Sequence, residues 1–363
     1  MNQLEEARAQ IATLDKEMAA LFEQRMRQVE SVLSYKMAHG LPILDANQEE
    51  KVLARNVSYI QDPTLQEYYV LFQRGVMEVS KSYQSRLMQG MKVAYCGIPG
   101  AFAHSAALKL FPDAKTLDFP DFEAAYRACE EGVADVAILP IENSYAGDVG
   151  RVMDLGFEGS LFINRMVQMD VTQNLLAVPG ATLADIRQVV SHPQALAQCS
   201  GYIREHQWEE LEYANTAMAA QFVAEKADKS VAAIASMETA RLYGLEVLDS
   251  HINASKENTT RFAVFSKSQN AVSQSKADDH FILIFTVRNE AGALAKILNI
   301  IGAHGFNMSS LHSRPMTGQV WKHYFFAELE GDVHSSNGQD LLRQLSTVCD
   351  KLKMTGSYRS VSL

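Results

Sequence analysis

The spacing of apolar residues changes character twice along this chain of 363 residues, and these changes constrain the fold more than any single motif. Residues 1–90 keep the apolar spacing of helices and contain almost no glycine. Residues 91–267 alternate short apolar runs with helical stretches, which is typical of an α/β domain with a largely parallel sheet. Residues 280–363 follow the ferredoxin-like order βαββαβ. The polar, aperiodic stretch 268–279 is predicted to be a linker.

The N-terminal segment predicts one long helix that packs along a partner. Apolar residues dominate two heptad rows, which are Leu4, Ile11, Met18, Arg25, Val32 and Ala7, Leu14, Leu21, Gln28, Tyr35. Gly40 and Pro42 end this helix, and Asp45 with Gln48 resembles the capping box of a second helix. Asp62 precedes a third. These helices bury little apolar surface as a monomer, so we expect a homodimer and leave stacking into a higher homo-oligomer open.

Charge and cysteine usage exclude several functional classes. The formal net charge of −10 disfavours a general electrostatic role on nucleic acid or an anionic membrane. No apolar run approaches the ~18 residues of a membrane span, and the N-terminal residues lack the basic and apolar regions of a signal peptide. The four cysteines form no CxxC pair, which argues against a disulfide scaffold or a zinc ribbon. We therefore expect a cytoplasmic protein that binds neither nucleic acid nor membrane.

Arg25 stands in the heptad seam at a position that normally holds an apolar residue. A buried unpaired guanidinium is costly, so it requires an anionic partner. Lys36 lies on the same stripe about 16 Å further along the axis, and both side chains can converge on one anionic ligand. Arg8 lies about 25 Å before Arg25 and can reach that ligand only from an antiparallel partner helix. Spacing alone favours solvated or salt-bridged cations, and an arginine in the seam can also simply set the register.

These cations give the segment a resemblance to the all-helical chorismate mutase family. The positions that match the family's substrate-binding pattern are Arg8, Arg25, Lys36, Asp45, Glu49, Ser80 and Gln84. The resemblance implies that Arg25 and Arg8 of the partner subunit bind the carboxylates. Lys36 and Gln84 would face the breaking ether oxygen, with Asp45 and Glu49 near the hydroxyl. The family commonly has arginine at the substrate-binding position of Gln48, which also fits a capping role.

Polar motifs follow the predicted strand ends of the central segment, where α/β folds bind ligands. They are Gly97-Ile98-Pro99-Gly100, Pro140-Ile141-Glu142-Asn143-Ser144, Ser191-His192-Pro193-Gln194 with Gln198, and Asn258-Thr259-Thr260-Arg261-Phe262. Singly, each has a structural explanation as a turn, a helix cap or a surface cation. Together, in this order and spacing, they resemble prephenate dehydratase. The resemblance implies two lobes like those of periplasmic binding proteins, with the active site in the cleft.

The dehydratase resemblance also implies roles for these residues. Thr260 would lie closest to the leaving hydroxyl, and Asn143 and Gln198 would orient the substrate. Arg261 would bind a carboxylate, and the remaining candidate substrate contacts are Ser144, Ser191 and His192. The reaction expels water and carbon dioxide from prephenate and requires no metal, flavin or nicotinamide, so no cofactor is expected.

Two questions stay open in this segment: which group donates the proton, and what replaces the hydroxyl groups that are missing at two positions. His104 and His192 are candidate proton donors by residue type, although a supporting role is favoured for both. The family usually carries hydroxyl residues where Ala101 and Ala103 stand. The hydrogen bonds that hydroxyl side chains make at those two positions in the family are expected either to be lost or to be made by backbone N–H groups or by Ser105.

In the C-terminal segment, Gly292-Ala293-Leu294 opens a predicted helix and Ser313-Arg314-Pro315 ends a predicted strand. These two motifs resemble the ACT domain, which follows the dehydratase in this family. The resemblance implies an amino-acid effector bound between subunits, with phenylalanine as the inhibitor. The candidate effector contacts are Gly292, Ala293, Leu294, Asn307, His312, Ser313, Arg314 and Pro315. The family usually has glutamate at the position of His312, so the identity of the effector stays open.

The order of the segments identifies the chain as a member of the bifunctional chorismate mutase–prephenate dehydratase family. The resemblance implies an all-α mutase domain over 1–90, a two-lobed α/β dehydratase domain over 91–267 and an α+β ACT domain over 280–363. Chorismate and prephenate would be the substrates, in phenylalanine biosynthesis. The alternatives are a dehydratase whose helical segment serves only dimerisation, a non-catalytic metabolite sensor, and a preference for arogenate over prephenate.

Overall fold

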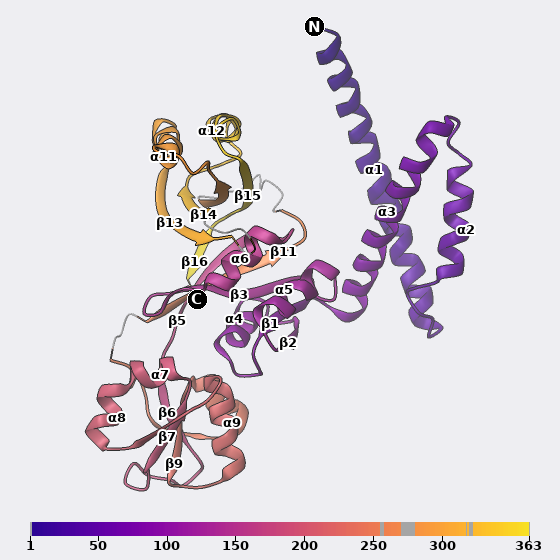
Figure 1. Ribbon diagram of the computed structural model, residues 1–363. Coiled ribbons are helices and arrows are strands. Elements are labelled where there is room, and N and C mark those ends of the chain that lie inside the picture. Colours follow the sequence, from indigo (N-terminus) through magenta and orange to yellow (C-terminus); the bar gives the residue numbers. More distant parts are fainter. Residues whose placement is uncertain (1, 255–257, 270–279, 317, 319–321, 363) are drawn as a thin grey trace. The chain divides into compact units, whose positions relative to one another are not determined.

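The computed structural model (Figure 1) describes residues 2–254, 258–269, 280–316, 318 and 322–362. The chain divides into two compact units, Met1–Met91 and Lys92–Leu363, and each has a fold of its own. Most of the predicted linker over 268–279 lies outside the described residues. None of the helices in the described part of the chain is long and apolar enough to cross a membrane.

The first unit is helical, and its helix ends carry clear sequence signals. Its elements are α1 (Gln3–Ala38), α2 (Ala46–Val57) and α3 (Pro63–Gln89). Asn2 caps α1 in a capping box with Glu5, and Asp62 caps α3. Asp45 caps α2 by accepting the backbone N–H of Gln48 at 3.0 Å. The caps and the helix starts therefore follow from local sequence.

The apolar heptad rows of α1 are largely uncovered within this unit. Leu14 is 57% exposed and Leu21 is 62% exposed. Exposed apolar surface of this extent marks an interaction face, because its burial is worth about 25 cal/mol per Å². The exposure supports the expectation that α1 packs along a partner.

The first lobe of the second unit is built on a mixed sheet with the order β16-β5-β11-β3-β1-β2, and β4 pairs with β3. Its strands are β1 (Lys92–Cys96), β2 (Lys115–Phe119), β3 (Val136–Asn143), β4 (Gly147–Asp148), β5 (Phe162–Asp170), β11 (Thr259–Ser266) and β16 (Ser360–Ser362). Its helices are α4 (Phe102–Leu110), α5 (Phe122–Glu131) and α6 (Gly150–Glu158).

The second lobe contains a sheet with the order β10-β6-β9-β7-β8. Its strands are β6 (Asn174–Ala177), β7 (Gln188–Ser191), β8 (Glu209–Glu212), β9 (Val231–Ala235) and β10 (Glu246–Asp249). Its helices are α7 (Pro193–Gln198), α8 (Ser200–His206), α9 (Thr216–Lys226) and α10 (Met237–Tyr243). The chain enters this lobe after β5 and returns to the first lobe at β11.

Both lobes have mixed sheets, so the prediction of a largely parallel sheet was wrong. The crossing between lobes is the physical reason. Strand β11 comes back from the second lobe and runs antiparallel to both of its neighbours, β3 and β5. Parallel pairing is retained where helical crossovers join the strands, as between β1 and β2 or β1 and β3.

The C-terminal part has the predicted ferredoxin-like order, with the antiparallel sheet β13-β14-β12-β15. Its elements are β12 (His280–Thr286), α11 (Ala293–Ala303), β13 (Asn307–Pro315), β14 (His323–Glu330), α12 (Ser336–Ser346) and β15 (Lys351–Tyr358). Figure 1 shows α11 and α12 on one face of this sheet.

The other face of this sheet packs on the first lobe. Strand β12 alternates between the faces, because Phe281 and Leu283 pack with α11 and α12 whereas Ile282 and Ile284 pack with the core of the first lobe. The first lobe's sheet is extended by β16, which pairs in parallel with β5. The C-terminal domain and the first lobe therefore share a continuous apolar core, which explains why they form one compact unit.

Candidate active sites and effector pocket

A cavity of about 160 Å³ in the helical unit gathers the predicted mutase residues from α1, α2 and α3. Its lining includes Arg25, Lys36, Asp45, Gln48, Glu49, Ser80, Lys81 and Gln84. Arg8 does not line it and is exposed. The role predicted for Arg8, from a partner subunit, stays a prediction.

The polar side chains of this cavity are held across helices. Arg25 Nη1 donates to Ser80 Oγ at 2.5 Å, and burial lowers the pKa of Arg25. Lys36 Nζ donates to the carbonyl of Ile43 at 2.6 Å. Gln84 is 7% exposed, and its Oε1 has no partner among the described residues. The amide of Gln84 is therefore available to hydrogen-bond a ligand in the cavity.

Lys81 is a cavity residue that the sequence pattern did not reveal. Its Nζ lies 3.3 Å from Glu49 Oε1 and 2.6 Å from Glu78 Oε1. The hydrogen bond to Glu78 is the main reason that the pKa of Lys81 is raised. Its position three residues before Gln84 on α3 was the available signal, since residues three apart lie on one side of a helix.

A second cavity, of about 500 Å³, lies in the cleft between the two lobes of the second unit. Asn143 and Thr260 line it from the first lobe, and His192 and Gln198 line it from the second. The predicted motif residues therefore meet from strands β3 and β11 and from helix α7 with its cap. Their meeting depends on the return of the chain to the first lobe, since Thr260 pairs with Asn143 across the antiparallel strands.

Asn143 is the centre of a hydrogen-bond network in this cleft. Its Nδ2 donates to Thr260 Oγ1 at 2.9 Å and to Asn258 Oδ1 at 3.1 Å. Because Thr260 Oγ1 accepts this bond, the hydroxyl proton of Thr260 is left to donate elsewhere. Gln198 Oε1 accepts from Asn258 at 3.0 Å and from Gln173 at 3.2 Å, which orients the amide nitrogen of Gln198 as a donor.

Gln173 and Gln194 are cleft residues to which sequence analysis gave no role. Gln194 Nε2 donates to Asn143 Oδ1 at 3.2 Å, which connects the two lobes. Gln173 is 2% exposed, and its Oε1 has no partner among the described residues. Gln194 belongs to the Ser-His-Pro-Gln motif, which could have pointed to it, whereas Gln173 stands in no motif.

The electrostatics of the cleft come from helix ends and from one carboxylate. Among the described residues that line it, none is a lysine or an arginine, and its one acidic side chain, Asp148, lies 2.7 Å from His312 Nδ1. Instead, residues at the N-terminal ends of α4, α6, α7 and α9 line it, including Ala103, Val149, Gln194 and Thr216. Free N–H groups and the helix macrodipole favour negative charge at such ends. The cleft is therefore suited to a carboxylate-bearing ligand despite its lack of cations.

Arg261 does not line the cleft, and its predicted role as a carboxylate ligand is corrected. Adjacent residues of a strand point to opposite faces, so Arg261 faces away from the side that Thr260 occupies. Its guanidinium bonds Glu142 at 3.1 Å and Glu328 of β14 at 2.9 Å. Arg261 therefore joins the first lobe to the C-terminal domain.

Ser144 and Ser191 also lie outside the cleft lining. Ser191 is fully buried and donates to the carbonyl of Ile234 at 2.6 Å, which holds β7 to β9. Ser144 Oγ accepts the backbone N–H of Thr259 at 2.9 Å. Both hydroxyl groups stabilise the loops that carry the cleft residues. The prediction of Ser191 as a substrate ligand is therefore corrected, whereas the role of Ser144 stays a prediction.

The histidines of this region have different positions. His192 lines the cleft, its Nδ1 accepts the N–H of Gln194 at 3.2 Å, and burial lowers its pKa. His104 instead holds the Gly97–Gly100 loop by accepting the N–H of Gly100 at 3.1 Å. Ala101 and Ala103 line the cleft, whereas Ser105 does not, so the expected role of Ser105 in their place is corrected.

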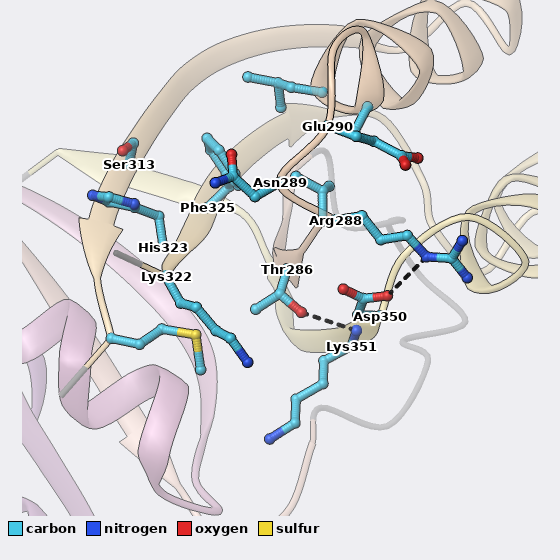
Figure 2. Close-up of a pocket in the computed structure, with 14 residues that line it drawn as sticks. Thr286, Arg288, Asn289, Glu290, Ser313, Lys322, His323, Phe325, Asp350 and Lys351 are labelled. Carbon is cyan, nitrogen blue, oxygen red and sulfur yellow. Dashed lines mark hydrogen bonds and ion pairs between the residues drawn. The ribbon is translucent and has the colours of Figure 1, made fainter. Parts of the chain in front are cut away.

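A third cavity, of about 480 Å³, lies in the C-terminal domain (Figure 2). Ala293, Leu294 and Ser313 line it among the predicted effector contacts. Its other polar residues are Thr286, Arg288, Asn289, Glu290, Lys322, His323, Asp350 and Lys351. Figure 2 shows Ser313 and His323 across the pocket from Arg288 and Asp350, which form an ion pair at 3.7 Å.

The remaining predicted effector contacts lie outside this pocket lining, and His312 and Arg314 are corrected to a docking role. His312 Nδ1 lies 2.7 Å from Asp148 of β4, and Arg314 makes a bidentate pair with Asp154 of α6 at 2.8 and 2.9 Å. They flank Ser313 on β13 and point to the opposite face. The other residues outside the lining are Gly292, which caps α11, Asn307 and Pro315.

The fold and sites define an enzyme with a helical cavity rich in cations, a two-lobed α/β cleft and a ferredoxin-like domain with its own pocket. The family models of chorismate mutase type II, prephenate dehydratase and the ACT domain match residues 7–85, 93–270 and 281–347. Among the described residues, no group of three or more His, Cys, Asp or Glu side chains is arranged to hold a metal ion.

One relative matches nearly the whole chain, and two solved structures match about three quarters of it. The bifunctional chorismate mutase/prephenate dehydratase of Enterobacter agglomerans is 31% identical, over 99% of this chain and 96% of the relative. A prephenate dehydratase from Arthrobacter aurescens, solved in complex with L-Phe, is 28% identical with a TM-score of 0.68, over 74% of this chain and 90% of that one. A structure described as GqqA, a novel type of quorum quenching acylase, is 33% identical with a TM-score of 0.69, over 74% of this chain and 98% of that one.

The chain belongs to the bifunctional chorismate mutase/prephenate dehydratase family. The predicted fold class, family and pair of enzymatic activities are confirmed by these matches.

Proposed function

We propose that the helical cavity converts chorismate to prephenate and that the interlobe cleft converts prephenate to phenylpyruvate. The convergence of Asn143, Gln198 and Thr260 in one hydrogen-bond network between the lobes carries this proposal. A ligand sensor would need a binding cleft but no hydroxyl poised as a donor beside it. The mutase part is supported by the gathering of Arg25 and Lys36 around one cavity.

In the mutase site, Arg25 and Lys36 supply the positive charge that the rearrangement requires. The reaction is pericyclic, so no nucleophile or proton transfer takes part. Arg25 binds a carboxylate and holds the compact conformer, and Lys36 stabilises charge on the breaking ether oxygen. Gln84 joins Lys36 there when its amide is turned so that nitrogen faces the cavity. Asp45 and Glu49 bind the substrate hydroxyl.

In the dehydratase site, Thr260 donates a hydrogen bond to the leaving hydroxyl of prephenate and positions it. The ring carboxylate leaves as carbon dioxide, its bonding electrons enter the ring, and the ring hydroxyl departs as water with one proton taken from solvent, so Thr260 keeps its own proton. Asn143 fixes the oxygen of Thr260, and Gln198 donates its amide N–H to the substrate. The N-terminal N–H groups of the surrounding helices bind the carboxylates in place of a cationic side chain.

The pocket of the ACT domain is proposed to bind phenylalanine as an inhibitor. Ala293 lies at the N-terminus of α11, where free N–H groups favour a carboxylate. Glu290 and Asp350 are the carboxylates in the pocket lining that suit the effector's amine. The uncovered heptad rows of α1 support a homodimer, and the four free cysteines support a reducing cytoplasm.

Separate assays with each substrate test this function. The purified full-length chain is supplied with chorismate, prephenate or arogenate, each with and without phenylalanine. We expect phenylpyruvate from chorismate and from prephenate, and inhibition by phenylalanine. Product from prephenate alone would leave the helical segment as a dimerisation element. Phenylalanine formed faster from arogenate would reassign the substrate, and phenylalanine binding without turnover would indicate a sensor.

A further inference from the structure

The helical cavity contains a cation, Lys81, that belongs to none of the sequence motifs. Among the described residues that line it, the cations are Arg25, Lys36 and Lys81, and the carboxylates are Asp45 and Glu49. Without Lys81, these charges would cancel before a dicarboxylate substrate entered. Two further negative charges would then face no net positive field.

The missing positive charge can be located at Gln48. Gln48 lines the same cavity from the first turn of α2 but carries no charge. Its neighbour Glu49 adds a negative charge on the same helix. Lys81 approaches from α3, and its Nζ lies 3.3 Å from Glu49 Oε1. The cation therefore reaches the wall of the cavity where Gln48 and Glu49 stand.

Lys81 is both held and accessible. Its side chain is 24% exposed, which is less than a freely solvated lysine and more than a core residue. Ser80 and Gln84, on either side of it along α3, line the same cavity. A shift of its ammonium group from Glu78 toward the cavity needs only rotation of a flexible four-carbon stem.

We infer that Lys81 binds a carboxylate of chorismate and supplies on α3 the positive charge that Gln48 does not supply on α2. In the empty site, Lys81 lies between Glu78, at 2.6 Å, and Glu49, at 3.3 Å. With substrate bound, its three N–H donors serve Glu49 and the substrate carboxylate together. This inference rests on the proposed mutase function of the same cavity.

The test compares Lys81→Gln with Lys51→Gln in the full-length chain. Lys51 is an exposed lysine of α2 that does not line the cavity. Initial rates of chorismate loss give kcat and KM, and dehydratase turnover on supplied prephenate reports that the chain is folded. We expect Lys81→Gln to raise KM for chorismate about tenfold or more, as expected for loss of a hydrogen bond to a charged group. Lys51→Gln keeps the wild-type values.

Rescue separates a binding role from a merely structural one. Adding Gln48→Arg to Lys81→Gln returns a cation to the cavity from the neighbouring helix, and we expect it to recover most of the lost kcat/KM. The same change in the wild type gives a smaller gain, so the two positions are non-additive.

Two results would overturn the inference. One is a Lys81→Gln enzyme with wild-type KM and kcat, and the other is a loss that Gln48→Arg does not recover. A wild-type chain that leaves chorismate unchanged while it still converts prephenate would instead refute the proposed mutase site, and the inference with it.

Discussion

The ion pair between Arg261 and Glu328 allows a quantitative test of how the ACT domain is held on the first lobe. Arg261 reaches both carboxylate oxygens, at 2.9 and 2.5 Å. The side chain of Glu328 is only 5% exposed, and that of Arg261 is 25% exposed. Replacing Arg261 by methionine leaves the carboxylate of Glu328 buried without its cation.

Removing one partner of a buried ion pair costs about 3–5 kcal/mol. Glu328 keeps the hydrogen bond from the Tyr358 hydroxyl, and Arg261 is partly solvated. We therefore expect Arg261→Met to lower the free energy of unfolding by about 3 kcal/mol, the lower end of that range. In the double variant with Glu328→Gln the buried charge at residue 328 is removed and the amide oxygen can still accept from the Tyr358 hydroxyl, so we expect most of the stability to return.

Urea unfolding of both variants, followed by circular dichroism, measures these differences, and prephenate kinetics at low temperature accompany it. Because Arg261 faces away from the cleft, the folded single variant is expected to keep its KM for prephenate within about threefold. A single variant with wild-type stability and a KM raised by about a hundredfold would refute this reasoning. Such a result would show that Arg261 binds the substrate.

Three further predictions concern the cleft and the domain interface. Thr260→Val removes the donor hydroxyl but keeps the shape, so dehydratase kcat is expected to fall at least about a hundredfold, whereas Thr260→Ser keeps most of it in the same assay. Burial alone would raise the pKa of Asp154, but hydrogen bonds from Arg314 and Tyr324 lower it overall. The resulting stability is complete above the unfolded-state pKa of about 4 and is lost as pH falls through the lower folded value. The urea midpoint of the wild type should therefore fall more steeply below about pH 4 than that of Asp154→Asn. A Cβ at Gly356 would lie 1.9 Å from the carbonyl oxygen of Ile163, so Gly356→Ala should lower the melting temperature strongly, whereas Gly201→Ala, with no atom within 4 Å, should not.

The element order and the cleft could be predicted because they depend on local signals. Helix caps such as Asp62 and the βαββαβ pattern depend on neighbouring residues. The cleft residues stand at the ends of strands, where polar motifs are recognisable. The pairing of Asn143 with Thr260 then follows once β11 returns beside β3.

The errors at Arg261, His312 and Arg314 share one physical cause, which is that a contiguous motif on a strand was treated as one contact surface. Thr260 and Arg261 are neighbours on β11, and only Thr260 reaches the cleft. On β13, Ser313 reaches the effector pocket while His312 and Arg314 dock on the first lobe. The two-residue alternation of strands would have separated these sets from sequence alone.

The docking of the ACT domain needed information from the three-dimensional structure. The apolar run over 281–285 could have indicated a strand buried on both faces, since such runs do not alternate. The run does not, however, identify the first lobe as the surface that covers the second face of this strand. Lys81 was missed because its role depends on α2 and α3 packing together, which brings Glu49 within reach.

The most direct test of the account supplies chorismate to the Thr260→Val variant at neutral pH and follows the products over time. If the helical cavity and the cleft are separate working sites with the roles proposed, prephenate accumulates at the wild-type mutase rate and almost no phenylpyruvate forms. Unchanged chorismate, or phenylpyruvate at the wild-type rate, would contradict the account.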